Sequence, residues 1–256
     1  MKPVDPPQAV ARRAIPRPPH NRAGGEAPWA GLPMAERQGI TLDRVRTALV
    51  REGRDVAGGE GPREPWPALA GQVVDGRPAA VLVPLFEEDG EVRVVLTVRS
   101  DRLSSHRGEV AFPGGRLEVG ESMEVAALRE ASEEVSLDPA SVTVVGQLTA
   151  MPTVSSNSVM TPVVGTLRAR PSLTASPSEV ERIFDVALAD LVADGVFHEE
   201  WWSVPERTGP GFPEGEFPVW FFDVAGETVW GATARTLMEL LCIVLGVSVP
   251  RMLGAR

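Results

Sequence analysis

Residues 114–137 read GGRLEVGESMEVAALREASEEVSL and join a Gly-Gly turn to a strongly acidic segment. The spacing of the apolar residues predicts a helix over Ser122–Val135, with its first residue as the N-cap. At about 100° per residue, Glu130, Glu133 and Glu134 fall on one patch of this helix. Like charges at such spacings destabilise a helix by about 0.2–0.5 kcal/mol per pair, so the cluster needs an explanation.

The acidic patch has two explanations, a solvated helix face and a divalent-cation site. The spacing favours the second, because oxygen ligands that converge on one patch are what Mg²⁺ and Mn²⁺ select. Glu121 lies at the entry to the helix, and Arg129 lies on a neighbouring face where it could hold a carboxylate or the loop. Gly114 and Gly115 allow the backbone to approach a ligand closely. The opposite side of the helix is expected to pack on a sheet through Val125, Leu128 and Val135.

The composition is that of an acidic chain with a sizeable core. The 256 residues carry a net charge of −10, which disfavours binding to nucleic acid or to anionic membranes. The single cysteine excludes an intramolecular disulfide, and no run approaches the roughly 18 apolar residues of a membrane span. The start of the chain lacks the apolar core of a signal peptide. We therefore expect a cytoplasmic protein that acts on a small molecule.

Proline and arginine are frequent in the first part of the chain. Residues 1–36 are predicted to be a disordered tail, because proline removes backbone donors and few large apolar side chains are present to be buried. Residues 37–250 are expected to form a single domain, and residues 251–256 a short C-terminal tail.

Helical and strand-like segments alternate through the expected domain. A helix is predicted for residues 41–52, and two strands, Ala80–Phe86 and Val92–Arg99, are predicted on either side of a Glu-Asp-Gly turn. A further strand is expected at Gly108–Phe112, and a closing helix at about Gly231–Leu245. Hairpins mixed with helices indicate an α+β sandwich instead of a doubly wound parallel sheet.

The order of residues in the acidic segment resembles the Nudix box. Gly115 is followed after five residues by Glu121, and after seven more by the run REASEE at residues 129–134, with Leu137 beyond it. This signature is long and specific. Ser136 stands where the box has a glycine that ends the helix, but this departure removes no metal ligand.

The residues before the box narrow the resemblance to the coenzyme A diphosphatase branch of the Nudix hydrolases. Residues 96–115 read LTVRSDRLSSHRGEVAFPGG and are similar to the extra motif of that branch. The matching positions are Leu96, Thr97, Arg99, Ser100, Gly108, Phe112, Pro113, Gly114 and Gly115. Two positions depart from it, since Ser104 stands where arginine is usual and Glu109 where glutamine is common.

The resemblance implies a Nudix-type α/β/α sandwich with a mixed β-sheet, and hydrolysis of a diphosphate linkage. For coenzyme A, the products would be adenosine 3′,5′-bisphosphate and 4′-phosphopantetheine. The implied ligands of Mg²⁺ or Mn²⁺ are Glu130, Glu133 and Glu134, with Glu121 as an additional or water-bridged ligand. Arg129 is expected to orient Glu121 and the loop.

Other roles around the implied site stay open at this stage. The residue that takes the proton of the attacking water could be Glu130, Glu133 or Glu179. Arg99 could contact a phosphate or form an ion pair at a strand end. His106 could act as a base, although a lone loop histidine is more often a surface or hydrogen-bonding residue.

Two alternative functions also stay open. One is a Nudix hydrolase of another diphosphate, such as ADP-ribose or NADH. The departure from the coenzyme A motif at Ser104 is consistent with this alternative. The other is a non-catalytic module that binds nucleotide or protein. Retention of every box carboxylate disfavours the module, because a pure binding module has no need of mutually repelling groups. The apolar C-terminal segment allows a homodimer without requiring one.

Overall fold

A computed structural model describes residues 15–55, 76–153, 158–204 and 215–250 of the chain. The helices are α1 (Met34–Gln38), α2 (Leu42–Arg51), α3 (Met123–Val135), α4 (Leu188–Leu191), α5 (Gly231–Leu245) and a 3₁₀ turn at Pro139–Ser141. The strands are β1 (Asn21–Ala23), β2 (Arg77–Glu88), β3 (Glu91–Arg99), β4 (Val110–Ala111), β5 (Gly114–Arg116), β6 (Val142–Gln147), β7 (Met151–Thr153), β8 (Ser158–Leu167), β9 (Val180–Ala187), β10 (Phe197–Ser203), β11 (Glu216–Val224) and β12 (Glu227–Trp230).

Within the described residues, these strands form two sheets. The larger has eight strands in the order β4-β3-β2-β8-β6, with β5 beside β2, β7 beside β8 and β9 beside β3. The pair β2–β8 is parallel and its neighbours are antiparallel, so this sheet is mixed. The smaller is an antiparallel sheet in the order β1-β10-β11-β12.

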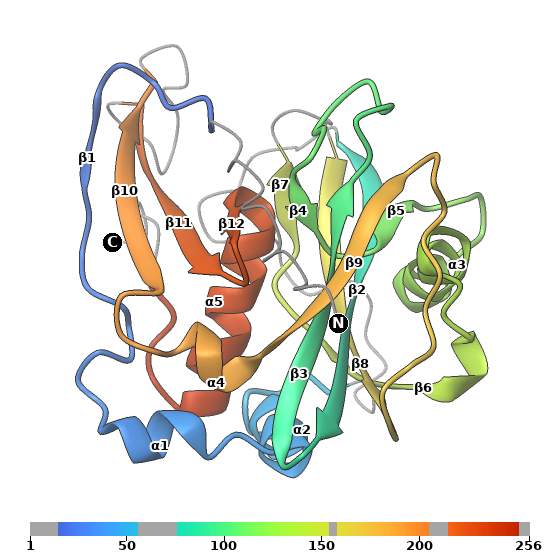
Figure 1. The fold of residues 1–256 in the computed structure, drawn as a ribbon, viewed down its shortest axis with the longest axis horizontal. Coiled ribbons are helices and arrows are strands. Elements are labelled where there is room, and N and C mark those ends of the chain that lie inside the picture. Colours follow the sequence, from blue (N-terminus) through green and yellow to red (C-terminus); the bar gives the residue numbers. More distant parts are fainter. Residues whose placement is uncertain (1–14, 56–75, 154–157, 205–214, 251–256) are drawn as a thin grey trace, which may run out of the picture.

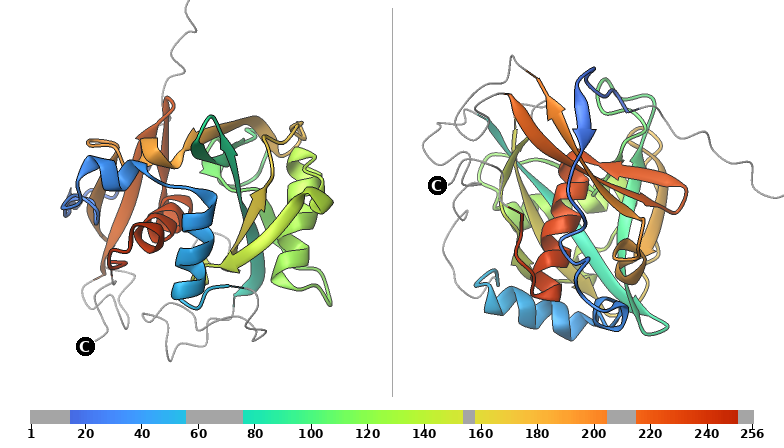
Figure 2. Two further views of the ribbon diagram at one scale, coloured as in Figure 1. Left: turned by 90° about the horizontal axis from the view of Figure 1, so that it is seen from below. Right: turned by 90° about the vertical axis from the view of Figure 1, so that its left-hand side faces the viewer.

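Helices cover both faces of the larger sheet (Figure 1). Helix α3 packs on one face, while α2 and α5 pack on the other, and the smaller sheet lies beyond α5 (Figure 2). One continuous apolar core joins α2 and α5 to both sheets. The predicted α+β class and the α/β/α sandwich with a mixed sheet are therefore confirmed. None of the described helices has the length and apolar character needed to cross a bilayer.

Local sequence signals account for most element boundaries. The Thr41 side chain accepts the Arg44 N–H at 3.1 Å and caps α2. Asp89 and Gly90, with φ of 53° and 80°, form the two-residue turn between β2 and β3. The predicted helices at 41–52, 122–135 and 231–245 are thus confirmed to within a residue or two. The strand predicted at Gly108–Phe112 is shorter, because only Val110–Ala111 pairs with β3.

The prediction of a disordered tail over residues 1–36 was wrong for residues 15–36. Trp29 is only 1% exposed and packs on Phe197 and Phe222, with ring centroids 5.4 and 6.2 Å away. Residues 21–23 add β1 to the edge of β10. The buried Trp29 ring and the β1 pairing together anchor a segment whose composition looks disordered. Residues 1–14, and the tail predicted at 251–256, lie outside the described residues.

The predicted apolar face of α3 needs a second correction. Val125 is 53% exposed, whereas the buried face consists mainly of three alanines, Ala126, Ala127 and Ala131, followed by Val135. Small side chains allow the helix backbone to lie close to the sheet. This close approach determines the geometry of the acidic residues described next.

Candidate functional site

The Gly-Gly turn is part of the larger sheet. Gly114 and Gly115 begin β5 and pair with Val81 and Ala80 of β2. A Cβ atom on Gly114 would lie 2.4 Å from the Ala80 carbonyl oxygen, and one on Gly115 would lie 2.4 Å from the Glu130 carboxyl carbon. Both positions therefore require glycine, the first for strand packing and the second for room beside a predicted ligand.

Arg129 engages three of the predicted site carboxylates. Its Nε and Nη2 donate to the two oxygens of Glu121 at 2.8 and 3.1 Å. Its Nη1 lies 3.0 Å from Glu130 Oε1 and 3.3 Å from Glu133 Oε2. The bidentate geometry fixes Glu121 at the helix entry. The hydrogen bond from Arg129 lowers the pKa of Glu121, and the Glu118 N–H adds to this effect.

Backbone groups complete this arrangement. Arg129 Nη2 also donates to the Arg116 carbonyl at 3.0 Å, and the Glu118 N–H donates to Glu121 Oε2 at 2.7 Å. These contacts tie the loop between β5 and α3 to the helix. Sequence reasoning missed both groups, because a backbone carbonyl or amide carries no residue-specific signal.

Glu134 is the most deeply buried carboxylate of the group, with 3% of its surface exposed. It accepts a hydrogen bond from the Gly114 N–H at 3.2 Å, and its Oε1 lies 3.8 Å from Arg99 Nη1. Burial raises the pKa of Glu134 to about 7, although Arg99 and the Gly114 N–H oppose the shift. An additional cation nearby would therefore stabilise the charged form of the Glu134 carboxylate.

Glu130 lies between Glu134 and the Arg129 contacts. Burial raises the pKa of Glu130 as well, against the opposing effect of Arg129. Glu133 differs, because its side chain is 61% exposed and it faces outward from the same helix. Of the three carboxylates that the spacing predicts on one patch, Glu130 and Glu134 thus lie in a part-buried site, and Glu133 lies at its rim.

Glu179 comes to this site from a distant part of the chain. The loop before β9 is fixed to the end of α3, since the Ser176 N–H donates to the Glu134 carbonyl at 2.8 Å. The Glu179 carbonyl accepts the Ser100 N–H at 2.8 Å, next to Arg99. The side chain of Glu179 is exposed, and its charge contributes to the raised pKa values of Glu130 and Glu134.

Ser136 ends α3 in the left-handed conformation that glycine usually supplies. Its φ is 56°, and its N–H and that of Leu137 donate to carbonyls of the last helical turn. The turn after the box is thus retained, and the substitution puts a residue with a side chain into a region that favours glycine.

The carboxylates suit a hard divalent cation by their chemistry. All four predicted ligands are glutamates, and burial raises the pKa of two of them, the buried Glu134 and the part-buried Glu130. Among the described residues, no three His, Cys, Asp or Glu side chains converge closely enough to form a ready metal site. The Arg129 guanidinium instead engages three of the four. The ligand assignment therefore stays a prediction.

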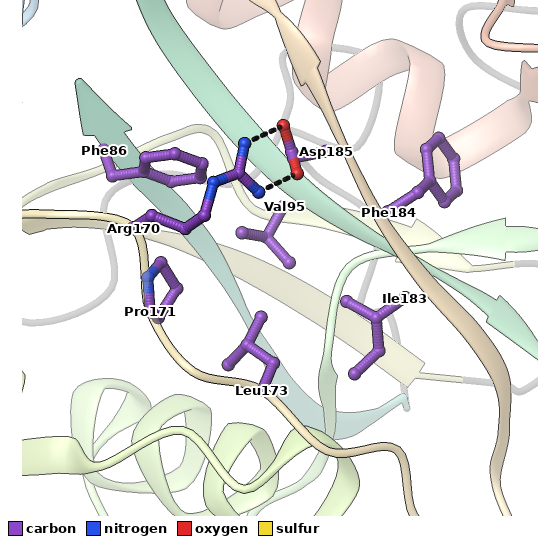
Figure 3. A pocket seen from close by; sticks show the side chains of 8 residues that line it. All are labelled: Phe86, Val95, Arg170, Pro171, Leu173, Ile183, Phe184 and Asp185. Atoms are coloured by element: carbon purple, nitrogen blue, oxygen red, sulfur yellow. Dashed lines mark hydrogen bonds and ion pairs between the residues drawn. The ribbon is translucent and has the colours of Figure 1, made fainter. Parts of the chain in front are cut away.

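A separate small cavity of about 220 Å³ lies between β9, the end of β2 and the loop after β8 (Figure 3). It is lined by Phe86, Val95, Arg170, Pro171, Leu173, Ile183, Phe184 and Asp185. Arg170 lies over the Phe86 ring and donates to both Asp185 oxygens. None of the predicted site residues lines this cavity.

Comparison with known proteins identifies the family. A family model described as the NUDIX domain matches residues 76–201. The chain is 37% identical over 175 residues to an uncharacterized Nudix hydrolase, NudL, of Citrobacter koseri, covering 68% of this chain and 86% of that one. It is 31% identical over 190 residues to Nudix hydrolase 3 of Caenorhabditis elegans, covering 71% and 79%. A solved structure of a MutT/nudix family protein from Enterococcus faecalis aligns with 81% of this chain and 73% of its own at 16% identity, with a TM-score of 0.38. The chain belongs to the Nudix hydrolase family.

Proposed function

We propose that this protein hydrolyses a diphosphate linkage in a reaction that depends on Mg²⁺ or Mn²⁺. The observation that carries the proposal is the part-buried pair Glu130 and Glu134, whose charges repel one another and that of Glu179. Desolvating carboxylates side by side costs free energy unless a cation compensates them. A diphosphate substrate brings further negative charge, so one cation would compensate the charges of both the carboxylates and the substrate.

Glu130, Glu133 and Glu134 would hold the metal, with Glu121 as an additional ligand. When bound, the ion would neutralise phosphate oxygens and lower the pKa of an attacking water. Arg129 orients Glu121 through its bidentate contact and fixes the loop, so its effect on the reaction is indirect. Gly114 and Gly115 keep the strand free of side chains that would block access.

The proton of the attacking water would pass to a carboxylate at the rim of this site. Glu133 and Glu179 are both exposed there, and Glu130 lies just inside. A base must be reachable by the water and unprotonated at neutral pH. Glu179 meets the first requirement, because the loop before β9 is hydrogen-bonded to the end of α3.

Coenzyme A or one of its derivatives is the substrate that we favour. The support is the segment 96–115, whose motif resembles the coenzyme A diphosphatase branch and which runs from β3 through β4 into the Gly-Gly turn. The products would be adenosine 3′,5′-bisphosphate and 4′-phosphopantetheine. ADP-ribose or NADH is the alternative, because Ser104 and Glu109 depart from that motif.

A product assay tests this proposal. The purified protein is incubated with Mg²⁺ or Mn²⁺ and with coenzyme A, an acyl-CoA, ADP-ribose or NADH, and the products are identified by mass. Release of 4′-phosphopantetheine supports the first substrate class, and cleavage of the others alone supports the alternative. Measurable nucleotide binding without any turnover would instead favour a non-catalytic module.

A pair of matched variants tests the ligand assignment. Glu133→Gln is predicted to lose most of the activity and to keep the circular dichroism spectrum of the wild type. Glu124→Gln, on the first turn of the same helix, is the control, because Glu124 contacts Gln147 and not Arg129. Equal activity of the two variants would refute the role of Glu133.

A further inference from the structure

His106 and Glu109 form a pair on the loop between β3 and β4. The His106 Nδ1 atom lies 2.8 Å from Glu109 Oε2, and the two side chains are about equally exposed. His106 has a φ of 55°, a left-handed conformation that non-glycine residues adopt rarely. Such a conformation persists where the surrounding structure imposes it.

A β-bulge places this pair beside Arg99. The Arg99 N–H donates to the Glu109 carbonyl at 3.0 Å, and the Gly108 N–H donates to the Arg99 carbonyl at 2.9 Å. Two residues thus oppose one, with Gly108 at a φ of 62°. Bulges of this kind redirect side chains and are frequent next to active sites. Arg99 and Glu109 are therefore direct cross-strand neighbours.

The hydrogen-bond donors of the Arg99 guanidinium are only partly satisfied by the residues that the structure describes. Its Nη1 lies 3.8 Å from Glu134 Oε1, a distance too long for a strong hydrogen bond. Its Nε is buried and has no hydrogen-bond partner among the residues that the structure describes. A buried donor without a partner destabilises the protein, so an oxygen atom supplied by a ligand would be stabilising here.

We propose that His106, oriented by Glu109, joins Arg99 in binding an anionic phosphate group of the substrate. This inference rests on the proposed function and extends it, since the sequence suggested for His106 only the role of a base and for Glu109 no role. The position is suitable because Arg99 joins the pair, through the bulge, to Glu134 and the Gly114 N–H. A protonated imidazole and a guanidinium together offer donors to the separate oxygens of one phosphate.

The neighbours of His106 favour its protonated form. The hydrogen bond to Glu109 raises the pKa of His106, while partial burial and the charge of Arg99 lower it less. Among the described residues, the charged groups that act on it are Glu109 and Arg99. The imidazole therefore keeps its proton to a higher pH than a free histidine, and phosphate binding should weaken as the pH rises through that pKa.

Steady-state kinetics of matched variants test the inference. Wild type, His106→Gln, Glu109→Gln and the control His198→Gln are compared from about pH 5.5 to about pH 8.5. His198 is a suitable control, because it also lies near carboxylates, those of Glu200 and Asp223, but on the smaller sheet. His106→Gln is expected to raise KM about tenfold at low pH with kcat within about twofold, as for loss of a charged hydrogen bond.

The pH dependence distinguishes this role from a structural one. The KM ratio of His106→Gln to wild type should fall toward 1 as the pH rises, and Glu109→Gln should move the midpoint of the wild-type KM profile to lower pH. A ratio that does not change with pH, a loss in kcat alone, or an equal effect of His198→Gln would overturn the inference.

Equilibrium binding separates this inference from the proposed function. Calorimetry with ADP and Ca²⁺ requires no turnover. If no diphosphate is hydrolysed but His106→Gln weakens ADP binding about tenfold, the proposed function fails and the phosphate contact stands. If hydrolysis is found and His106→Gln binds ADP like the wild type, the hydrolase stands and the phosphate contact is refuted.

Discussion

Helix α5 carries a buried ionic cluster whose removal should cost much of the stability of the protein. Glu239 is fully buried, and its Oε1 accepts hydrogen bonds from the Thr149 N–H at 3.1 Å and from Thr149 Oγ1 at 2.6 Å. Glu239 Oε1 also lies 3.0 Å from Arg54 Nη2, and Glu239 Oε2 lies 3.7 Å from Arg235 Nη1. One carboxylate thus joins α5 to the chain beyond α2 and to the loop between β6 and β7.

The magnitude follows from what Glu239→Leu would leave behind. Arg235 is buried, and desolvation already lowers its pKa to about 10 with Glu239 present. Removing one member of a buried ion pair costs about 3–5 kcal/mol, since the remaining charge loses its counter-ion. Arg54 is 22% exposed and can turn to solvent, so we place the loss near the middle of that range, at about 4 kcal/mol. Glu239→Gln keeps an acceptor for Thr149 and should lose only about 2 kcal/mol.

Urea unfolding followed by circular dichroism and by fluorescence measures these losses, provided that the two transitions coincide. The double variant Arg235→Met/Glu239→Leu supplies the decisive comparison. Because it removes both buried charges, it should be more stable than Glu239→Leu alone by about 2 kcal/mol. The reasoning is refuted if Glu239→Leu lies within about 1 kcal/mol of wild type, or if the double variant is no more stable than the single one.

Three further predictions concern stability. Ser136→Gly should raise the free energy of unfolding by about 0.5–1 kcal/mol, because glycine tolerates the φ of 56°, and urea titration measures the gain. Trp29→Ala should lower it by about 3–5 kcal/mol, whereas a disordered segment would show no change. Although burial opposes it, hydrogen bonds from Arg170 and Arg93 hold the pKa of Asp185 below its usual value. The resulting stability is present above about pH 4 and lost as the pH falls through the lowered pKa, so the melting temperatures of wild type and Arg170→Gln should converge in acid.

The sequence predicted best those elements that local signals determine. Periodicity and a capping residue gave α2 and α3, and the Asp89-Gly90 turn gave the hairpin of β2 and β3. The parallel pairing of β2 with β8 is nonlocal and has no such signal. The segment around Trp29 was not predicted for a different reason, since its composition resembles a linker, whereas its order comes from a buried aromatic ring and from nonlocal pairing with β10.

In the candidate site, too, the features set by local sequence could be predicted and the nonlocal features could not. Helical spacing was sufficient to bring Glu130 and Glu134 together, because both lie on α3. Their burial was not predictable, since it depends on how closely the helix approaches the sheet. The bulge that brings Glu109 beside Arg99 was hidden as well, because the pattern of a short loop does not reveal which residue opposes which.

The close approach of α3 to the sheet is what makes this acidic cluster suited to binding a cation. The helix presents Ala126, Ala127 and Ala131 to the strands, so its backbone lies near β5 and its carboxylates reach the Gly-Gly turn. Larger side chains on that face would move the glutamates outward into water, where each charge would be solvated and a cation would gain little. Near the low-dielectric interior, the same charges interact more strongly with one another and with any ion placed among them. The spacing of large apolar residues predicts Val125 as a packing position, but on this helix the smallest side chains make the packing contacts.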